Sequence, residues 1–358
     1  EGQVQVGEPK IIERLDAFSA PSLVEYFDPD PCNVMLYSEE AESADAATVE
    51  KARSPADGLG VTVESKFTVG EYDIVILSAQ ESDGLETWLI ENGYNIPRGA
   101  SELLQPYIKQ QLKFFVAKVN LEEFAQSGFQ SLRPLQMAYE SSRFMLPIRL
   151  GMINAQGEQD LIVYLLSPQG QVELTNYRTV HIPSNVNLPV FIKEEFADFY
   201  RDMFETSHKR ENKKVAFLEY AWDMSWCDPC AADPLTPEEL KQAGVFWLNP
   251  TNPNNVFITR LHVRYSRSTF PEDLHFTTTG NRQNFQGRYI LNHPYEGEIT
   301  CPEGREYRKY VKQRKEGEVQ TLAKLTDWDI NKIRQKAKLA VPHQDPWWQR
   351  IFRRLTGR

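Results

Sequence analysis

Long hydrophobic runs are absent from this chain of 358 residues. No apolar stretch approaches the roughly 20 residues that a membrane-spanning helix requires, so the sequence predicts no transmembrane segment. An excess of positive charge is also absent, because 40 Lys and Arg residues stand against 50 Asp and Glu residues and the net charge is -10. A surface of this average sign repels nucleic acid and anionic lipid, and nucleic acid is therefore excluded as an expected partner.

The local signatures of several enzyme classes are missing as well. The segment from Asn281 to Arg288 holds no glycine-rich phosphate loop, and no Gly-x-Ser-x-Gly nucleophile elbow occurs in the chain. No internal repeat at a fixed period and no heptad long enough for a coiled coil is found. The sequence thus lends no support to a hydrolase or a nucleotide-binding protein, indicates no cofactor, and favours a non-enzymatic role.

Cysteine is rare, and the 4 cysteines are Cys32, Cys227, Cys230 and Cys301. An even number permits three pairings and fits an oxidising compartment, while the spacing leaves the pairing open. The chain begins with Glu1 rather than Met, so we expect a processed or trimmed product from which any signal segment has been removed. These features predict an extracytoplasmic protein, located in the periplasm, in a lumen or outside the cell.

Hydrophobic residues make up 41% of the chain and aromatic residues 11%, which is ample for a folded core. Runs of β-branched and aromatic residues predict strands at 61–65, 72–78, 114–119, 135–139, 145–152, 161–166, 172–182, 215–220, 256–265 and 288–292. Helical periodicity and capping patterns predict helices at 83–93, 101–111, 194–206 and 302–325, and a well-marked start at Thr236-Pro237. The predicted fold class is α+β, with largely antiparallel sheets and flanking helices.

Composition divides the chain into segments. Residues 1–37 are predicted to be the N-terminal helical remnant of a larger unit, because two short helices expected between 8 and 26 have little around them to bury their apolar face. Residues 38–58 are rich in Glu, Ala, Ser and Asp and predict an acidic disordered linker. Residues 59–340 are expected to form the main α+β domain, and residues 345–358 a C-terminal amphipathic basic helix.

This C-terminal helix carries two adjacent tryptophans beside arginines. The pattern suits a membrane surface or a protein partner, and it suits docking onto the chain's own domain equally well. The residues expected to make the membrane or partner contact are Trp347, Trp348, Arg350, Ile351, Phe352, Arg353 and Arg354.

The run Trp226-Cys227-Asp228-Pro229-Cys230 is the pattern most closely tied to chemistry. A Cys-x-x-Cys pair serves as a redox dithiol, as half of a zinc site, or as part of structural disulfides. Pro234 prevents a long helix from starting at the motif, and a helix N-terminus is what would activate the first thiolate. The favoured interpretation is structural disulfides among all the cysteines, with Cys227 and Cys230 catalytic only if the pair is redox-active.

Histidines offer a weaker alternative. His262, His275 and His293, with Glu272, Asp273 and Arg264 near them in the sequence, could bind a metal or move protons if their strands pair. No spacing forces two ligands onto one face, as a His-Glu-x-x-His helix would. We therefore predict no metal site and keep these histidines as weak candidates.

Several unusual strings occur in one order along nearly the whole chain. They are Arg14–Ala17, Leu23–Cys32, Gly70–Asp73, Glu81–Leu89, Phe115–Val119, Leu218–Trp222, Cys227–Cys230 and Thr259–Tyr265. On these strings the chain resembles a bacterial family called domain of unknown function 2330. The resemblance implies an exported bacterial protein with no assigned activity, whose relatives usually carry further N-terminal sequence.

Three functions remain open from the sequence, and the last of them is a metal-assisted hydrolase around His262, His275 and His293. The first is a disulfide-stabilised, extracytoplasmic binding or scaffold protein with a protein partner or a membrane surface as its target. The alternative is a thiol-disulfide oxidoreductase in which Cys227 is the nucleophile and Cys230 the resolving thiol.

Overall fold

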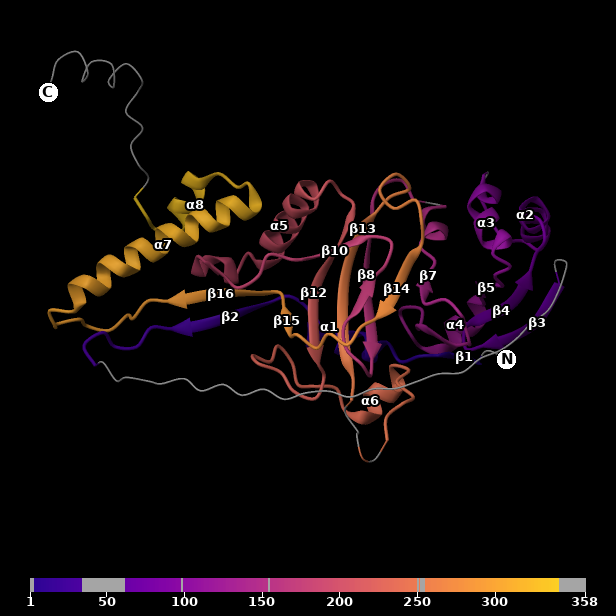
Figure 1. Cartoon of the computed structure of the whole chain (residues 1–358), viewed down its shortest axis with the longest axis horizontal. Helices are drawn as coiled ribbons and strands as arrows, with labels where there is room; N and C mark the ends of the chain where they lie inside the picture. Colours follow the sequence, from indigo (N-terminus) through magenta and orange to yellow (C-terminus); the bar gives the residue numbers. More distant parts are fainter. Residues whose placement is uncertain are drawn as a thin grey trace, which may run out of the picture. The chain divides into compact units, whose positions relative to one another are not determined.

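The computed structural model describes residues 3–33, 62–97, 99–153, 155–249, 251 and 255–340 (Figure 1). The predicted linker 38–58 and the predicted C-terminal helix 345–358 lie outside the described residues. The chain divides into two compact units, the first drawn from residues 1–20, 42–181 and 212–286, the second from 21–41, 182–211 and 287–358. The domain boundaries expected from composition stay a prediction.

The first unit is built on a central sheet of long strands (Figure 1). Its strands are β8 (Gln159–Ser167), β10 (Arg178–His181), β12 (Val215–Asp223), β13 (Phe257–Tyr265) and the short β15 (Phe285–Gln286). β13 lies between β8 and β12 and is antiparallel to both, whereas β10 runs parallel to β12. Because almost every residue of β12 and β13 is buried, both strands read as nearly continuous apolar runs, as strands covered on both faces do.

Two apolar clusters cover the faces of this sheet. The cluster on one face of the sheet includes Leu218 of β12 and Leu261 of β13, together with Ile148 and Val172. The opposite face packs Tyr220, Trp222 and Ile258 against helix α1 (Pro9–Ser19), whose Ile11, Leu15 and Phe18 recur at helical spacing. Helix α6 (Pro237–Gln242) borders this second cluster, and its predicted start is confirmed by a capping box between Thr236 and Glu239.

A smaller sheet in the same unit has the order β3-β4-β5 and is antiparallel throughout. Its elements are β3 (Thr62–Val69), β4 (Tyr72–Ser78), α2 (Ser82–Glu91), α3 (Ala100–Lys109), β5 (Phe114–Val119) and α4 (Leu121–Ser127). The predicted helix at 83–93 is confirmed, but its start is wrong, because Glu81 occupies the N-cap and makes no side-chain cap bond. Short ribbons complete the unit: β1 (Gln3–Val6) with β6 (Leu135–Ala138), and β14 (Leu274–Thr278) with β7 (Met145–Leu146) and β9 (Val172–Leu174).

Two predicted strands are broken in the structure. The strand expected at 145–152 ends after Leu146, and a 3-10 turn follows at Arg149–Met152. The backbone N–H groups of Ile148 and Arg149 donate to the buried carboxylate of Asp273, which replaces the ladder partners that a strand would need. The strand expected at 172–182 is likewise split into β9 and β10.

The second unit combines a three-stranded parallel sheet with helices. Its elements are β2 (Ser22–Phe27), β11 (Val186–Leu188), the 3-10 helix η2 (Val190–Lys193), α5 (Phe196–Arg210), β16 (Arg288–His293), α7 (Gly304–Thr326) and α8 (Ile330–Lys336). The prediction of a second short helix before Asp28 is wrong, because residues 22–27 form β2. Every residue of β2 pairs with β16, a partner far along the chain. Long-range pairing of this kind overrides local helical rhythm.

The fold class is α+β, as predicted, and antiparallel pairing predominates. Parallel pairs occur between β10 and β12 and within the sheet of the second unit. Across the part of the chain that the structure describes, no helix combines the length and the apolar character that crossing a membrane demands.

Candidate functional site

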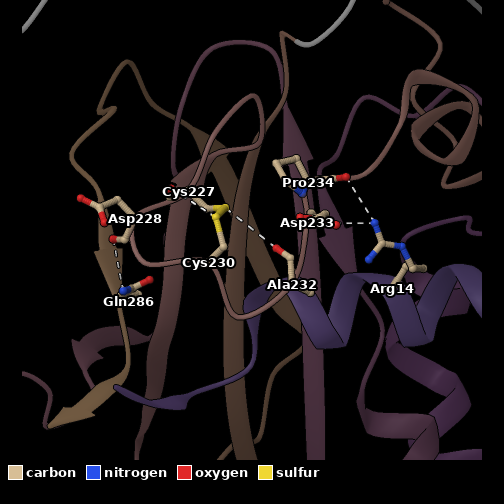
Figure 2. The surroundings of a disulfide bond; sticks show 8 residues. All are labelled: Arg14, Cys227, Asp228, Cys230, Ala232, Asp233, Pro234 and Gln286. Atoms are coloured by element: carbon tan, nitrogen blue, oxygen red, sulfur yellow. Dashed lines mark hydrogen bonds between the residues drawn. A yellow bond between two sulfur atoms is a disulfide. The ribbon is translucent and has the colours of Figure 1, made fainter. Parts of the chain in front are cut away.

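The Cys-x-x-Cys motif lies in an irregular loop after β12, where Cys227 and Cys230 form a disulfide with a Cα–Cα distance of 5.0 Å (Figure 2). The Asp228-Pro229 peptide bond within the ring is cis. Cys227 is half-buried and packs against the apolar cluster on the α1 face of the sheet, whereas Cys230 is exposed. Cys230 is therefore the more solvent-accessible of the two cysteines.

Side chains of neighbouring elements form hydrogen bonds to the backbone of this loop (Figure 2). The guanidinium of Arg14 on α1 donates to the carbonyl oxygens of Asp233 (3.1 Å) and Pro234 (3.2 Å). The Gln286 amide donates to the carbonyl oxygen of Asp228 at 3.5 Å. The loop is thus held by hydrogen bonds from side chains to its carbonyl oxygens, and these bonds do not involve the sulfur atoms.

The contacts of the two sulfurs differ from those of an activated dithiol. The Sγ atom of Cys227 lies 3.9 Å from the carbonyl oxygen of Ala232, and that of Cys230 lies 3.3 Å from the carbonyl oxygen of Cys227. The next helix along the chain, α6, begins only at Pro237, so within the described residues the motif is not followed directly by a helix N-terminus. Helix dipoles and cationic neighbours are what usually favour a thiolate, and carbonyl oxygens do the opposite.

The second feature of the first unit is a row of charged and polar side chains across β8, β12 and β13, which we call the charged ladder. Its members are Asp16, Asp160, Tyr164, Glu219, Arg260, His262 and Arg264. The three β13 residues alternate along the strand and therefore share one face. The ladder thus occupies the same face of the sheet as α1.

A β-bulge brings Glu219 into the ladder. Leu218 pairs with Leu261 and Tyr220 pairs with Arg260, so Glu219 is an extra residue in β12. A bulge re-aims the side chain of the inserted residue. The two carboxylate oxygens of Glu219 reach Arg260 Nε at 2.7 Å and His262 Nδ1 at 2.8 Å.

Arg260 is the centre of the ladder, and only 7% of its side chain is exposed. One of its terminal nitrogens donates to Asp16 at 2.6 Å and to the Tyr164 hydroxyl at 3.2 Å. The guanidinium also lies 5.3 Å from the centre of the Tyr164 ring, a cation–π contact. A buried cation is stable only when paired and hydrogen-bonded, and both conditions hold here.

The other half of the ladder runs toward solvent. His262 Nε2 lies 3.1 Å from Asp160, which also accepts two bonds from Arg264 at 2.8 and 3.0 Å. The two ring nitrogens of His262 thus lie beside two different carboxylates, those of Glu219 and Asp160. The Asp160 side chain is half-exposed, so this end of the ladder meets water.

The electrostatics of the ladder indicate a structural network. Burial opposes ionisation of Asp16 and Asp160, but hydrogen bonds from Arg260 and Arg264 outweigh it and hold the pKa of each carboxyl below its ordinary value. Burial raises the pKa of Tyr164, and the charge of Glu219 raises the pKa of Arg260 in spite of burial. These four groups keep one charge state around neutral pH, unlike groups that exchange protons during catalysis.

The candidate histidines are not assembled into a metal site. His262 belongs to the ladder, and His275 lies on β14, where its backbone N–H donates to Asn176. His293 belongs to the second unit, where it bonds Glu25 at 2.8 Å and stacks on Phe27. Within the described ranges, no three His, Cys, Asp or Glu side chains are grouped in a way that could hold a metal ion.

The acidic residues near those histidines have other roles. Asp273 is fully buried and accepts bonds from the Tyr107 hydroxyl at 2.7 Å and from two backbone N–H groups, while Arg149 lies 3.2 Å away. Glu272 accepts a bond from the Asn176 amide. The C-terminal contact residues expected from Trp347 to Arg354 lie outside the described residues.

A second polar cluster lies in the second unit beside a disulfide between Cys32 and Cys301, whose Cα atoms are 5.6 Å apart. Arg314 of α7 makes two bonds to Asp28 at 2.8 and 2.9 Å, and the Tyr307 hydroxyl adds a third at 2.6 Å. One helical turn from Arg314, the buried Glu318 lies 3.6 Å from Arg314 Nε. This separation is too long for a hydrogen bond.

Glu318 is predicted to make the stability of the second unit depend on pH. Burial raises the pKa of this carboxyl to about 7, and the charge of Arg314 offsets only part of the effect. A folded-state pKa above the unfolded value of 4.5 means that the folded state binds the proton more tightly. The contribution of Glu318 to stability is therefore fully present below pH 4.5 and is lost as pH rises toward 7, by up to about 3 kcal/mol.

Replacing Glu318 by Gln should remove this fall and stabilise the protein above pH 7, measured as the free energy of unfolding in urea at several pH values. The matched control is Glu316→Gln on the same helix. Arg334 bonds Glu316 and holds the pKa of its carboxyl below the ordinary value, so this control should lose a little stability at neutral pH. An unchanged pH slope in Glu318→Gln would contradict the assignment.

Fold and site together define a two-unit α+β protein with two disulfides and a hydrogen-bonded network of charged side chains across its central sheet. The chain belongs to the bacterial family described as "Uncharacterized protein conserved in bacteria (DUF2330)", whose family model matches residues 1–277. The resemblance expected from the sequence strings is therefore confirmed. No curated protein and no solved structure matches the chain.

The family strings contribute directly to the charged ladder. Asp16, Glu219, Arg260, His262 and Arg264 all lie within strings that carried the resemblance. Sequence reasoning singled out only His262 and Arg264 among them. The sequence signal for the ladder is Glu219, a lone carboxylate inside the apolar run Val215–Tyr220. A buried acid requires a cationic partner, so this residue predicts a buried arginine, lysine or histidine beside it.

Proposed function

We propose that this chain is a non-enzymatic, extracytoplasmic bacterial protein that binds or scaffolds a partner and is stabilised by its disulfides. The observation that carries the proposal is that every one of the 4 cysteines is paired, as Cys32 with Cys301 and Cys227 with Cys230, and none is free. Structural disulfides persist in oxidising compartments and are rare in a reducing cytosol.

The polar networks support a binding role over catalysis. The buried members of the charged ladder are engaged with one another, and Asp28, Tyr307 and Arg314 are engaged in the second unit. Catalytic acids and bases instead need a group that faces substrate with a pKa tuned to its task. The function is therefore assigned to the surface rather than to these buried charges.

The cellular location of the protein and the pairing of its cysteines are tested together in a bacterial host that produces the full-length protein. Cells quenched in acid and alkylated before reduction should yield no labelled cysteine, and peptide mapping should return the two disulfides named above. Fractionation should place the protein outside the cytoplasm, with a cytosolic enzyme as the marker of leakage. Free Cys32 and Cys301 thiols in the quenched cells would overturn the proposal.

A thiol-disulfide oxidoreductase is the second candidate, and the observation that favours it is the exposure of Cys230. An external thiolate could attack this sulfur, release the Cys227 thiolate and form a mixed disulfide, after which a second thiol would complete the reduction. This order differs from the one expected from the sequence, in which Cys227 is the nucleophile and Cys230 the resolving thiol.

The two candidates predict opposite outcomes of one titration. If the Cys227–Cys230 bond is structural, it should resist glutathione buffers down to about -300 mV, and the protein should not accelerate insulin reduction. The oxidoreductase would be established by two results together. The reduction potential of the Cys227–Cys230 bond would lie above about -230 mV, and Cys227→Ser would abolish insulin reduction while leaving the protein folded.

A further inference from the structure

A hollow of about 500 Å³ opens in the first unit between β9, β10 and the loop that precedes β15. This volume falls within the range of roughly 300–1,000 Å³ typical of small-molecule sites. Leu174 and the fully buried Leu218 provide apolar lining. The remaining lining is mostly polar, which distinguishes the hollow from a gap in the core.

Several polar groups that line the hollow lack partners. Within the described part of the chain, the side chains of Glu173, Gln283 and Asn284 make no hydrogen bond or ion pair. The hydroxyl oxygen of Thr179 is buried and also has no hydrogen-bond partner there. Gln283 and Asn284 are exposed and Glu173 is half-buried, so these three side chains can bond a molecule that enters the hollow.

The loop that presents the amides is held in place before any ligand arrives. Asn281 accepts a bond from the Gln283 backbone at 3.0 Å and exchanges bonds with Gln171 through its main chain and its side chain. Arg282 donates to the carbonyl oxygens of Pro168 and Gln169. A fixed loop loses little conformational entropy on binding, which favours recognition.

Two of the aromatic residues that line the hollow stack on each other. The rings of His181 and Phe285 stack with centres 4.3 Å apart and planes 18° from parallel. Arg178 is the only Lys or Arg among the described lining residues, and it already has an interaction of its own. With the carboxylate of Glu173 in the same lining, the site is unsuited to phosphate or another anion.

We propose that this hollow binds a neutral carbohydrate, a ligand class that specifies the binding role proposed above and depends on it. Sugar hydroxyls both donate and accept, which matches the amides of Gln283 and Asn284 and the carboxylate of Glu173. The C–H face of a sugar ring packs against a flat aromatic surface such as that of His181 and Phe285. Anionic ligands lack the cationic partners they need here.

The test uses the full chain with its disulfides intact and four named probes: cellotriose, maltotriose, laminaritriose and diacetylchitobiose. Saturation-transfer NMR and titration calorimetry should detect at least one of them with a Kd below about 1 mM. The Glu173→Gln and Asn284→Ala variants should each weaken that binding by about threefold to tenfold. Glu102→Gln, an exposed carboxylate on α3 of the same unit, is the matched control and should bind like the wild type.

The outcomes separate this proposal from the one on which it rests. Absence of binding by every probe to correctly folded protein would overturn the carbohydrate site, and so would binding that the Glu173 and Asn284 variants leave unchanged. Binding of pyrophosphate or of a capped tetrapeptide in the hollow, in place of the sugars, would also overturn it. Free thiols or a cytoplasmic location would refute the proposed function while leaving a measured sugar affinity in place.

Discussion

Replacing Arg260 by Met is expected to lower the free energy of unfolding by about 3–5 kcal/mol. The substitution keeps most of the aliphatic volume but removes the cation that neutralises Glu219, whose side chain is only 1% exposed. Asp16 and the Tyr164 hydroxyl lose a donor at the same time. Urea unfolding of the wild type and the variant at neutral pH measures the loss, and hydrogen exchange should show it in β12 and β13.

Two further variants distinguish an uncompensated charge from general damage to the core. The double variant Glu219→Leu with Arg260→Met removes both charges and should recover much of the lost stability, because an apolar pair tolerates burial without a partner. The exposed pair of Lys113 with Glu64 offers a matched comparison, and Lys113→Met should lose less than about 1 kcal/mol. A double variant as unstable as Arg260→Met alone would contradict the role assigned to the charge.

The sequence predicts the elements of this fold better than their pairing. Strands such as 72–78 and 256–265 are confirmed because their apolar periodicity is a local property. The helix predicted over residues 22–27 is wrong because the partner of β2 is β16, more than two hundred residues later in the chain. Parallel pairing across such a separation leaves little local trace in the sequence, apart from the β-branched and aromatic content of the segment.

The candidate site is also only partly predictable from the sequence, but for a different reason. The Cys-x-x-Cys motif is visible as a string, and so is the proline that keeps a helix from starting at it. The charged ladder depends on the bulge at Glu219, whose effect is to place an acid beside Arg260 and His262 on the neighbouring strand. Register and bulges are set by tertiary packing, so spacing along the chain could not reveal the ladder.

Removing the Cys32–Cys301 disulfide by replacing both cysteines with Ser should destabilise the protein by about 4–5 kcal/mol. The two residues are 269 positions apart, and a cross-link that closes a long loop restricts the unfolded chain strongly. The bond also joins the turn after β2 to the segment before α7, close to the bonds between Asp28 and Arg314. Urea unfolding of oxidised wild type and double variant gives the difference, and exchange should increase most in β2 and α7.

The second disulfide provides the matched control within the same molecule. Cys227 and Cys230 are separated by 3 positions, so the same loop-entropy argument assigns their bond about 2 kcal/mol or less. The double Cys227→Ser, Cys230→Ser variant should accordingly unfold at a urea concentration closer to that of the wild type. If the two double variants lose equal stability, loop closure is not what the long-range bond contributes. If only the Cys32–Cys301 variant is strongly destabilised, the short ring is dispensable for the stability of the fold.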